Sequence, residues 1–96
     1  MNSNRPEVSI VIPVFNAKET LKILTARIKA AMDLQKRSFE LILVKDGSSD
    51  SSWDQIQELA REYAFVRGID LMRNYGQHNA LLCGIREAKS DIIVTM

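Results

Sequence analysis

Several features that mark whole classes of proteins are scarce or missing in this sequence. Its 96 residues include a single cysteine, Cys83, which excludes an intramolecular disulfide and fits a reducing compartment. No apolar run approaches the ~20 residues that a membrane-spanning helix needs, and residues 1–7 lack the charged and then apolar pattern of a signal peptide. We therefore expect a cytoplasmic chain in which Cys83 is a buried small hydrophobe.

An excess of one charge and glycine-rich phosphate loops are also missing. The formal net charge is +1 with 26% charged residues, so nucleic acid is not an expected partner. Neither Gly-x-Gly-x-x-Gly nor Gly-x-x-x-x-Gly-Lys-Ser/Thr occurs, which argues against a dehydrogenase-type dinucleotide site and a Walker loop. A chain of this length, 46% hydrophobic, has room for one small globular domain and no second one.

The hydrophobic pattern alternates between the periods of strands and helices. Nearly continuous apolar runs predict strands over residues 8–15, 39–44, 65–71 and 91–96. Helical spacing predicts helices over residues 17–34, 52–63 and 78–88. Pro13 cannot donate to a ladder and is expected to end the first strand near that residue, while Gly68 weakens the third strand.

The helical patterns also indicate which side chains face the core. In the first helix, Asn16 and Glu19 have the spacing of a capping box. In the third helix, apolar residues at helical spacing point inward, and a glycine between them allows close packing; these are Leu81, Ile85, Ala88 and Gly84. Four lysines of the first helical segment occupy other faces, which form either a solvated surface or a basic surface for anionic lipid. They are Lys18, Lys22, Lys29 and Lys36.

Strand and helix follow each other three times before a last strand, with short connections throughout. This order implies right-handed crossovers and an α/β fold with a doubly wound parallel sheet and helices on both faces. If the chain reverses direction after the third strand, the strand order is 3-2-1-4. Residues 8–96 form this domain, and residues 1–7 are expected to be disordered or extended. The last strand has nothing after it, which indicates a truncated domain and predicts edge pairing or dimerisation.

Polar turns follow the first three strands at one edge of the predicted sheet, where open α/β sheets bind ligands. Asp46 either accepts hydrogen bonds from a ligand or serves only as a turn and cap residue. Arg73 offers a planar fork for phosphate or carboxylate, or is a surface ion-pair partner. Gly76 permits a close backbone approach that other residues resist.

Three stretches together resemble glycosyltransferase family 2. They are residues 8–16 (VSIVIPVFN), 43–50 (LVKDGSSD) and 73–78 (RNYGQH). The resemblance spans about residues 8–96, and the third stretch is most similar to the branch that transfers a sugar from a nucleotide to a polyprenyl phosphate. It implies a Rossmann-like fold of the GT-A type and an inverting transferase whose donor is a UDP-sugar.

The resemblance also implies roles for individual residues. Pro13 and Phe15 would lie along the nucleoside, with Phe15 in the place of a usual tyrosine. Asp46 would accept a hydrogen bond from the uracil imide nitrogen, Arg73 would lie near the diphosphate, and Gly76 would let the backbone pass close to the donor. Two positions depart from the family: Ala17 replaces a frequent glutamate, and Lys45 stands where many members have another aspartate.

Other parts of the activity are implied to lie beyond Met96. They include the acidic motif for Mg²⁺ or Mn²⁺, the catalytic base, the site for a lipid-phosphate or saccharide acceptor, and helices that anchor the longer protein to the inner face of the membrane. The 96-residue chain is therefore expected to hold no metal and to be inactive alone. The alternatives are a stand-alone nucleotide-binding or regulatory module and a structural α/β domain whose turns are only caps.

Overall fold

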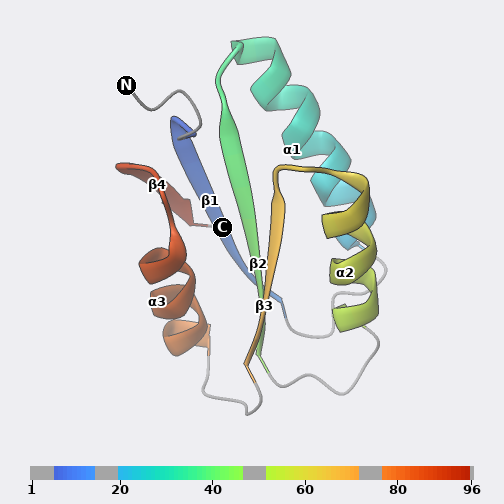
Figure 1. Cartoon of the computed structure of the whole chain (residues 1–96), viewed down its shortest axis with the longest axis vertical. Coiled ribbons are helices and arrows are strands. Elements are labelled where there is room, and N and C mark those ends of the chain that lie inside the picture. Colours follow the sequence, from blue (N-terminus) through green and yellow to red (C-terminus); the bar gives the residue numbers. More distant parts are fainter. Residues whose placement is uncertain (1–5, 15–19, 47–51, 72–76, 96) are drawn as a thin grey trace.

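A parallel four-stranded sheet with helices on both faces forms the core of the chain (Figure 1). The computed structural model describes residues 6–14, 20–46, 52–71 and 77–95. Along the chain the elements are β1 (Val8–Val14), α1 (Leu21–Gln35), β2 (Phe39–Asp46), α2 (Ser52–Glu62), β3 (Val66–Leu71), α3 (Gln77–Glu87) and β4 (Ile92–Thr95). The strand order is β3-β2-β1-β4 and every pairing is parallel, which confirms the predicted topology.

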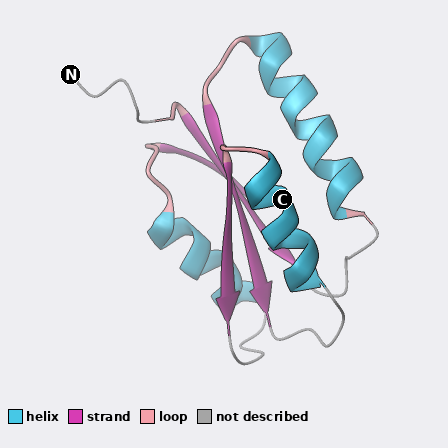
Figure 2. Ribbon diagram, turned by 45° about the vertical axis from the view of Figure 1, so that its right-hand side comes forward, coloured by secondary structure: helices cyan, strands magenta, loops and turns pink. Residues whose placement is uncertain are grey.

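The helices divide between the two faces of the sheet (Figure 2). On one face, α1 and α2 cover a core to which β1 contributes alternate residues from Val8 to Val14, and β2 contributes Leu41 and Leu43. On the other face, Leu81 of α3 and Ala88, the residue after this helix, pack against a smaller cluster. That cluster consists of Val11, Ile42 and Val44, which are all fully buried. β2 is buried on both faces, as expected of a central strand in a parallel sheet.

Three expectations about the elements are corrected. The first helix begins at Leu21 instead of at residue 17, and its N-cap residue, Thr20, makes no side-chain capping bond. The capping box expected of Asn16 and Glu19 lies outside the described residues. Ile85 is 37% exposed and does not face the core, because the narrow contact between α3 and the sheet is filled by Leu81, Gly84 and Ala88. Cys83 is half-buried instead of buried.

β1 ends one residue after Pro13, which agrees with the expected end near that residue. The strand continues to Val14, and Pro13 stays in register with Val44 of β2. The described pairing with β4 stops two residues earlier, at Val11 and Thr95. A residue without an N–H is therefore tolerated here, because the described ladder on the β4 side has already ended.

Two glycines let helices approach the sheet closely. A Cβ atom at Gly68 would lie 2.5 Å from Cγ2 of Ile56 and 3.2 Å from the ring of Trp53, both on α2. A Cβ atom at Gly84 would collide with Cγ1 of Val11 and lie 3.1 Å from Cγ2 of Val44. The glycine expected to weaken the third strand is thus the position at which α2 packs on β3, and Gly84 does allow the close packing expected of it.

A hydrogen-bond network joins β1, β2, β3 and the loop before β4 at the amino edge of the sheet. The carboxylate of Glu40 in β2 accepts a bond from Oγ of Ser9 (2.5 Å), from Nη1 of Arg67 in β3 (2.9 Å) and from the backbone N–H of Lys89 (2.7 Å). The Arg67 guanidinium also donates to the Glu87 carbonyl (2.9 Å), and the N–H of Ser90 donates to Ser9. The loop from α3 to β4 is thereby fastened to β1, β2 and β3.

The pKa of Glu40 reflects this environment. Burial raises the pKa of the carboxyl, but the bonds from Lys89, Ser9 and Arg67 outweigh that effect and hold the pKa below its ordinary value of 4.5. Because the folded chain keeps Glu40 ionised to lower pH than the unfolded chain does, the network stabilises the fold at neutral pH. That contribution is lost as the pH falls through the folded-state pKa.

We expect Gly84→Ala to destabilise the fold, although the same change in an open helix stabilises it by about 1 kcal/mol. The added methyl group would overpack against Val11, at a cost of about 1–3 kcal/mol in urea unfolding. Val11→Ala in the same chain should recover part of that loss, so the double variant would be less destabilised than the sum of the single ones. Arg86→Ala, at an exposed position of the same helix, is the control. A Gly84→Ala chain as stable as the parent would contradict the close contact.

We expect Glu40→Gln to cost about 1–3 kcal/mol at pH 7, because a charged acceptor of three bonds is replaced by a neutral amide. The parent chain should also lose more stability than this variant between pH 5 and pH 3, since only the parent has the depressed pKa. Urea unfolding at several pH values measures both effects, and Glu58→Gln on the exposed side of α2 is the matched control. Parallel stability curves for the parent and Glu40→Gln would show that the network contributes no acid sensitivity.

Candidate functional site

The carboxyl ends of β1, β2 and β3 form one aligned edge. Val14 is in register with Lys45, Lys45 with Asp70, and Asp46 with Leu71. The two helices that follow β2 and β3 begin at this same edge, at Ser52 and Gln77, as Figure 1 shows at its lower end. Residues that directly follow these strands therefore start from neighbouring positions, as the sequence predicted.

Two of the five predicted site residues lie in described strands. Pro13 is half-buried one residue before the end of β1, and Asp46 is the last residue of β2. The other three, Phe15, Arg73 and Gly76, fall outside the described residues. Phe15 directly follows β1, and Arg73 comes two residues after Leu71, which pairs with Asp46. The structure thus aligns the ends of the strands that precede these residues, and their contacts with a nucleotide stay predictions.

Helix N-termini give this edge a partial positive charge. α2 and α3 both start here, and their first N–H groups have no partner within the helix. α3 carries no acidic residue in its first turn, whereas α2 carries Asp54. An anionic group such as a phosphate is therefore favoured near the start of α3.

An ion pair that was not predicted from the sequence lies at the carboxyl edge of the sheet. Nζ of Lys45 is 3.7 Å from Oδ1 of Asp70 on the neighbouring strand, with the two side chains 13% and 30% exposed. Lys45, one of the two residues that depart from the family pattern, thus forms an ion pair with a carboxylate from β3. The pair could have been found from the register alone, because Lys45 and Asp70 are opposite each other once β2 and β3 are aligned.

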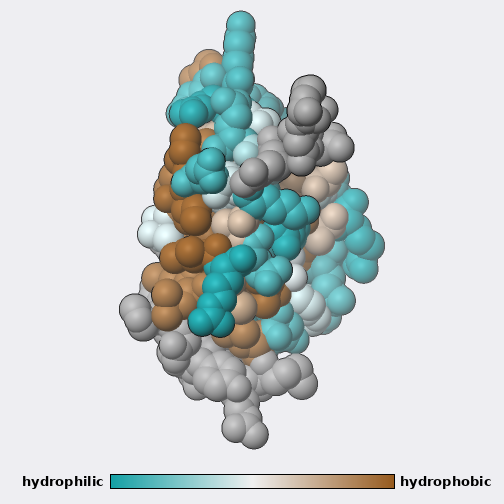
Figure 3. Space-filling model, turned by 60° about the vertical axis from the view of Figure 1, so that its left-hand side comes forward, coloured by the Kyte–Doolittle hydropathy of each residue, from teal (hydrophilic) through white to brown (hydrophobic). Residues whose placement is uncertain are grey.

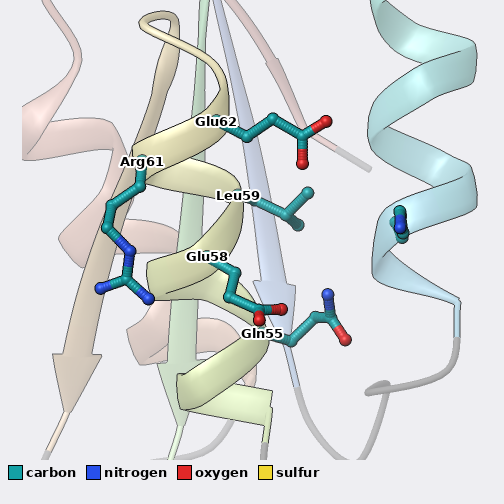
Figure 4. A pocket seen from close by; sticks show the side chains of 6 residues that line it. Gln55, Glu58, Leu59, Arg61 and Glu62 are labelled. Atoms are coloured by element: carbon teal, nitrogen blue, oxygen red, sulfur yellow. The ribbon is translucent and has the colours of Figure 1, made fainter.

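A separate groove of about 440 Å³ lies between α1 and α2 (Figure 4). Its floor is Leu59, and Gln55, Glu58 and Glu62 point from α2 toward α1, whereas Arg61 points away. Lys22 lines it from the α1 side. The groove is open, carries charges of both signs and is not part of the strand-end edge.

The described residues do not form a metal site. No group of three or more His, Cys, Asp or Glu side chains within them is close enough to hold a metal ion.

Comparison with solved structures identifies the fold. A mannosyltransferase, PcManGT from Pyrobaculum calidifontis in complex with GDP-Man and Mn²⁺, superposes with a TM-score of 0.77 at 19% identity, over 95% of this chain and 27% of that one. S. aureus TarS superposes with a TM-score of 0.78 at 23% identity, over 94% of this chain and 26% of that one. The sheet is thus the Rossmann-like sheet of GT-A glycosyltransferases.

Curated relatives are more similar in sequence. The undecaprenyl-phosphate 4-deoxy-4-formamido-L-arabinose transferase of Shewanella sediminis is 45% identical over 96 residues, and that of Yersinia enterocolitica is 44% identical over 91 residues. These matches cover 99% and 94% of this chain but only 29% and 28% of the relatives. The model of glycosyl transferase family 2 matches residues 9–96. The chain therefore belongs to glycosyl transferase family 2.

Proposed function

We propose that this chain binds the nucleotide-sugar donor of a glycosyltransferase that acts on a polyprenyl phosphate. The observation that carries the proposal is the aligned edge at which β2 ends in Asp46, beside β1 and at the start of α3. The acceptor class is supported by the names of the relatives, which are undecaprenyl-phosphate transferases. Since the chain spans less than a third of their length, the transfer reaction belongs to a longer protein of this kind.

The donor is proposed to be a UDP-sugar. Asp46 would accept a hydrogen bond from the uracil imide N–H, a group that cytosine lacks. Pro13 and Phe15, at the end of β1 and just after it, would supply apolar surface along the nucleoside. The register supports this arrangement, because it places the ends of β1 and β2 side by side.

The diphosphate would lie toward α3. The N-terminus of that helix has no acidic residue in its first turn, and the segment before it contains Arg73 and Gly76. Arg73 would pair with phosphate oxygens through its planar fork, and Gly76 would allow a close backbone approach. We further propose that Mg²⁺ or Mn²⁺ assists the longer protein, held by residues outside this chain, and that helices outside it anchor that protein to the membrane. The neighbouring mannosyltransferase structure contains Mn²⁺.

The donor site is tested by titrating the 96-residue chain with UDP and CDP in a calorimeter. We expect UDP to bind more tightly, and Asp46→Ala to weaken UDP by about 10–100-fold because a charged acceptor is lost, while CDP changes little. Asp33→Ala, an exposed aspartate on α1, is the matched control. Equal affinity for both nucleotides, or no effect of Asp46→Ala, would contradict the assignment. Absence of any heat with UDP would favour a purely structural domain.

We also propose that the isolated 96-residue chain self-associates through β4. In the described sheet β4 is an edge strand, and Ile92, Ile93 and Val94 are 47%, 37% and 42% exposed. Figure 3 shows hydrophobic side chains gathered on this side of the molecule. Unpaired backbone groups beside apolar side chains favour pairing with another strand. Light scattering at rising concentration should show a dimer that Val94→Lys weakens, and a monomer at all concentrations would contradict the pairing.

A further inference from the structure

The outer face of α1 has an apolar ridge that nothing in the described chain covers. Leu34 is 85% exposed and Ile23 is 59% exposed, the two highest values among the large hydrophobic residues described. Ala26 and Ala30 are exposed between them. At 100° per residue these four side chains share one side of the helix, opposite the buried Leu21, Thr25, Ile28 and Met32. The ridge is about 16 Å long.

Positive charges lie on both sides of this ridge. Residues 20–37 contain five cations, Lys22, Arg27, Lys29, Lys36 and Arg37, and a single anion, Asp33. Asp33 is already paired with Lys29 at 2.6 Å, and Arg37 lies 3.9 Å from Glu7. Helical geometry places Lys22 on one flank of the ridge and Arg27 on the other, and neither forms an ion pair with a described residue.

A shallow groove adjoins the amino end of the ridge. It has a volume of about 260 Å³ and is lined by Thr20, Ile23, Leu24 and Arg27. A cation beside an apolar surface matches the chemistry of a phospholipid, whose phosphate lies directly above its acyl chains. No helix within the described residues is long and apolar enough to cross a membrane, so contact through this face would be peripheral.

We propose that the outward face of α1 docks on an anionic lipid bilayer. Ile23 and Leu34 enter the interface between headgroups and acyl chains, while Arg27 extends along the ridge to reach phosphate oxygens. Charge complementarity favours this occupant over a second copy of the chain, because pairing two such helices would bring two cationic faces together. The inference concerns a surface outside the donor site, so it stands or fails independently of sugar transfer.

Sedimentation with sucrose-loaded vesicles tests the proposal. The 96-residue chain should partition onto vesicles of phosphatidylcholine with 30% phosphatidylglycerol and stay in solution with phosphatidylcholine alone. We expect the double variant Ile23→Ser, Leu34→Ser to lose about tenfold or more in partitioning, and Arg27→Gln about fivefold. Raising the salt concentration should weaken binding of the parent chain. Ala30→Glu, which places an anion on the ridge, should abolish binding without removing a packed side chain.

Matched controls lie on α3, where Leu82 is 44% exposed and Arg86 is exposed. Leu82→Ser and Arg86→Gln should partition like the parent, and circular dichroism verifies that each variant is folded. Failure to bind anionic vesicles, equal binding to neutral ones, or equal losses in the α3 controls would overturn the proposal. So would light scattering that shows a dimer dissociated by the α1 variants, because it would identify a second copy as the occupant.

Discussion

The parallel register of β1, β2 and β3 is the constraint on which the rest of the structure depends. In a strand, successive side chains face opposite sides of the sheet, so a slip of one residue would exchange the two faces of β2. Val44 would leave the cluster under α3, and Lys45 would leave its partner on β3. β2 resists such a slip, because Leu41, Ile42, Leu43 and Val44 are all fully buried and each side chain is packed against the neighbours of its own face. The positions at the carboxyl edge are therefore set by packing in the middle of the sheet.

Polar contacts at the amino edge complement this packing. Hydrophobic burial sets which face a residue takes, but it is not directional. The bonds of Glu40 to Ser9, Arg67 and Lys89 require specific donors at specific positions, so they define how β1, β2, β3 and the loop before β4 fit together. Glu40 is only 5% exposed, and a carboxylate buried to that extent is tolerated because each of its oxygens accepts hydrogen bonds.

Much of this architecture could be predicted from the sequence. Short connections between alternating strand and helix patterns predict a parallel sheet and, with a reversal after the third strand, its order, and the resemblance in residues 8–16, 43–50 and 73–78 indicates its family. The apolar faces of α1 and α2 follow from the helical spacing of their apolar residues alone. The prediction that Ile85 faces the core is wrong, because hydrophobic periodicity does not show how wide the contact between a helix and the sheet is. Gly84 makes the contact of α3 narrow. The Lys45–Asp70 and Glu40–Arg67 pairs join residues 25 and 27 positions apart, so they become visible only once the register is known.

The candidate site was predictable in outline and less so in detail. The convergence of the strand ends follows from topology, whereas Phe15, Arg73 and Gly76 lie outside the described residues. The sequence also left the outer face of α1 undecided between a solvated surface and a lipid surface. Its lysines are visible in the sequence, but the exposure of Ile23 and Leu34 between cations depends on which side of the helix packs against the sheet.

Glu40 and Asp46 stand at opposite ends of the same strand, about 20 Å apart at 3.3 Å per residue. The hydrogen bonds around Glu40 are thus remote from the carboxyl edge of the sheet. Substitutions at the carboxyl edge are therefore expected to leave the Glu40 network intact and to cost little thermodynamic stability.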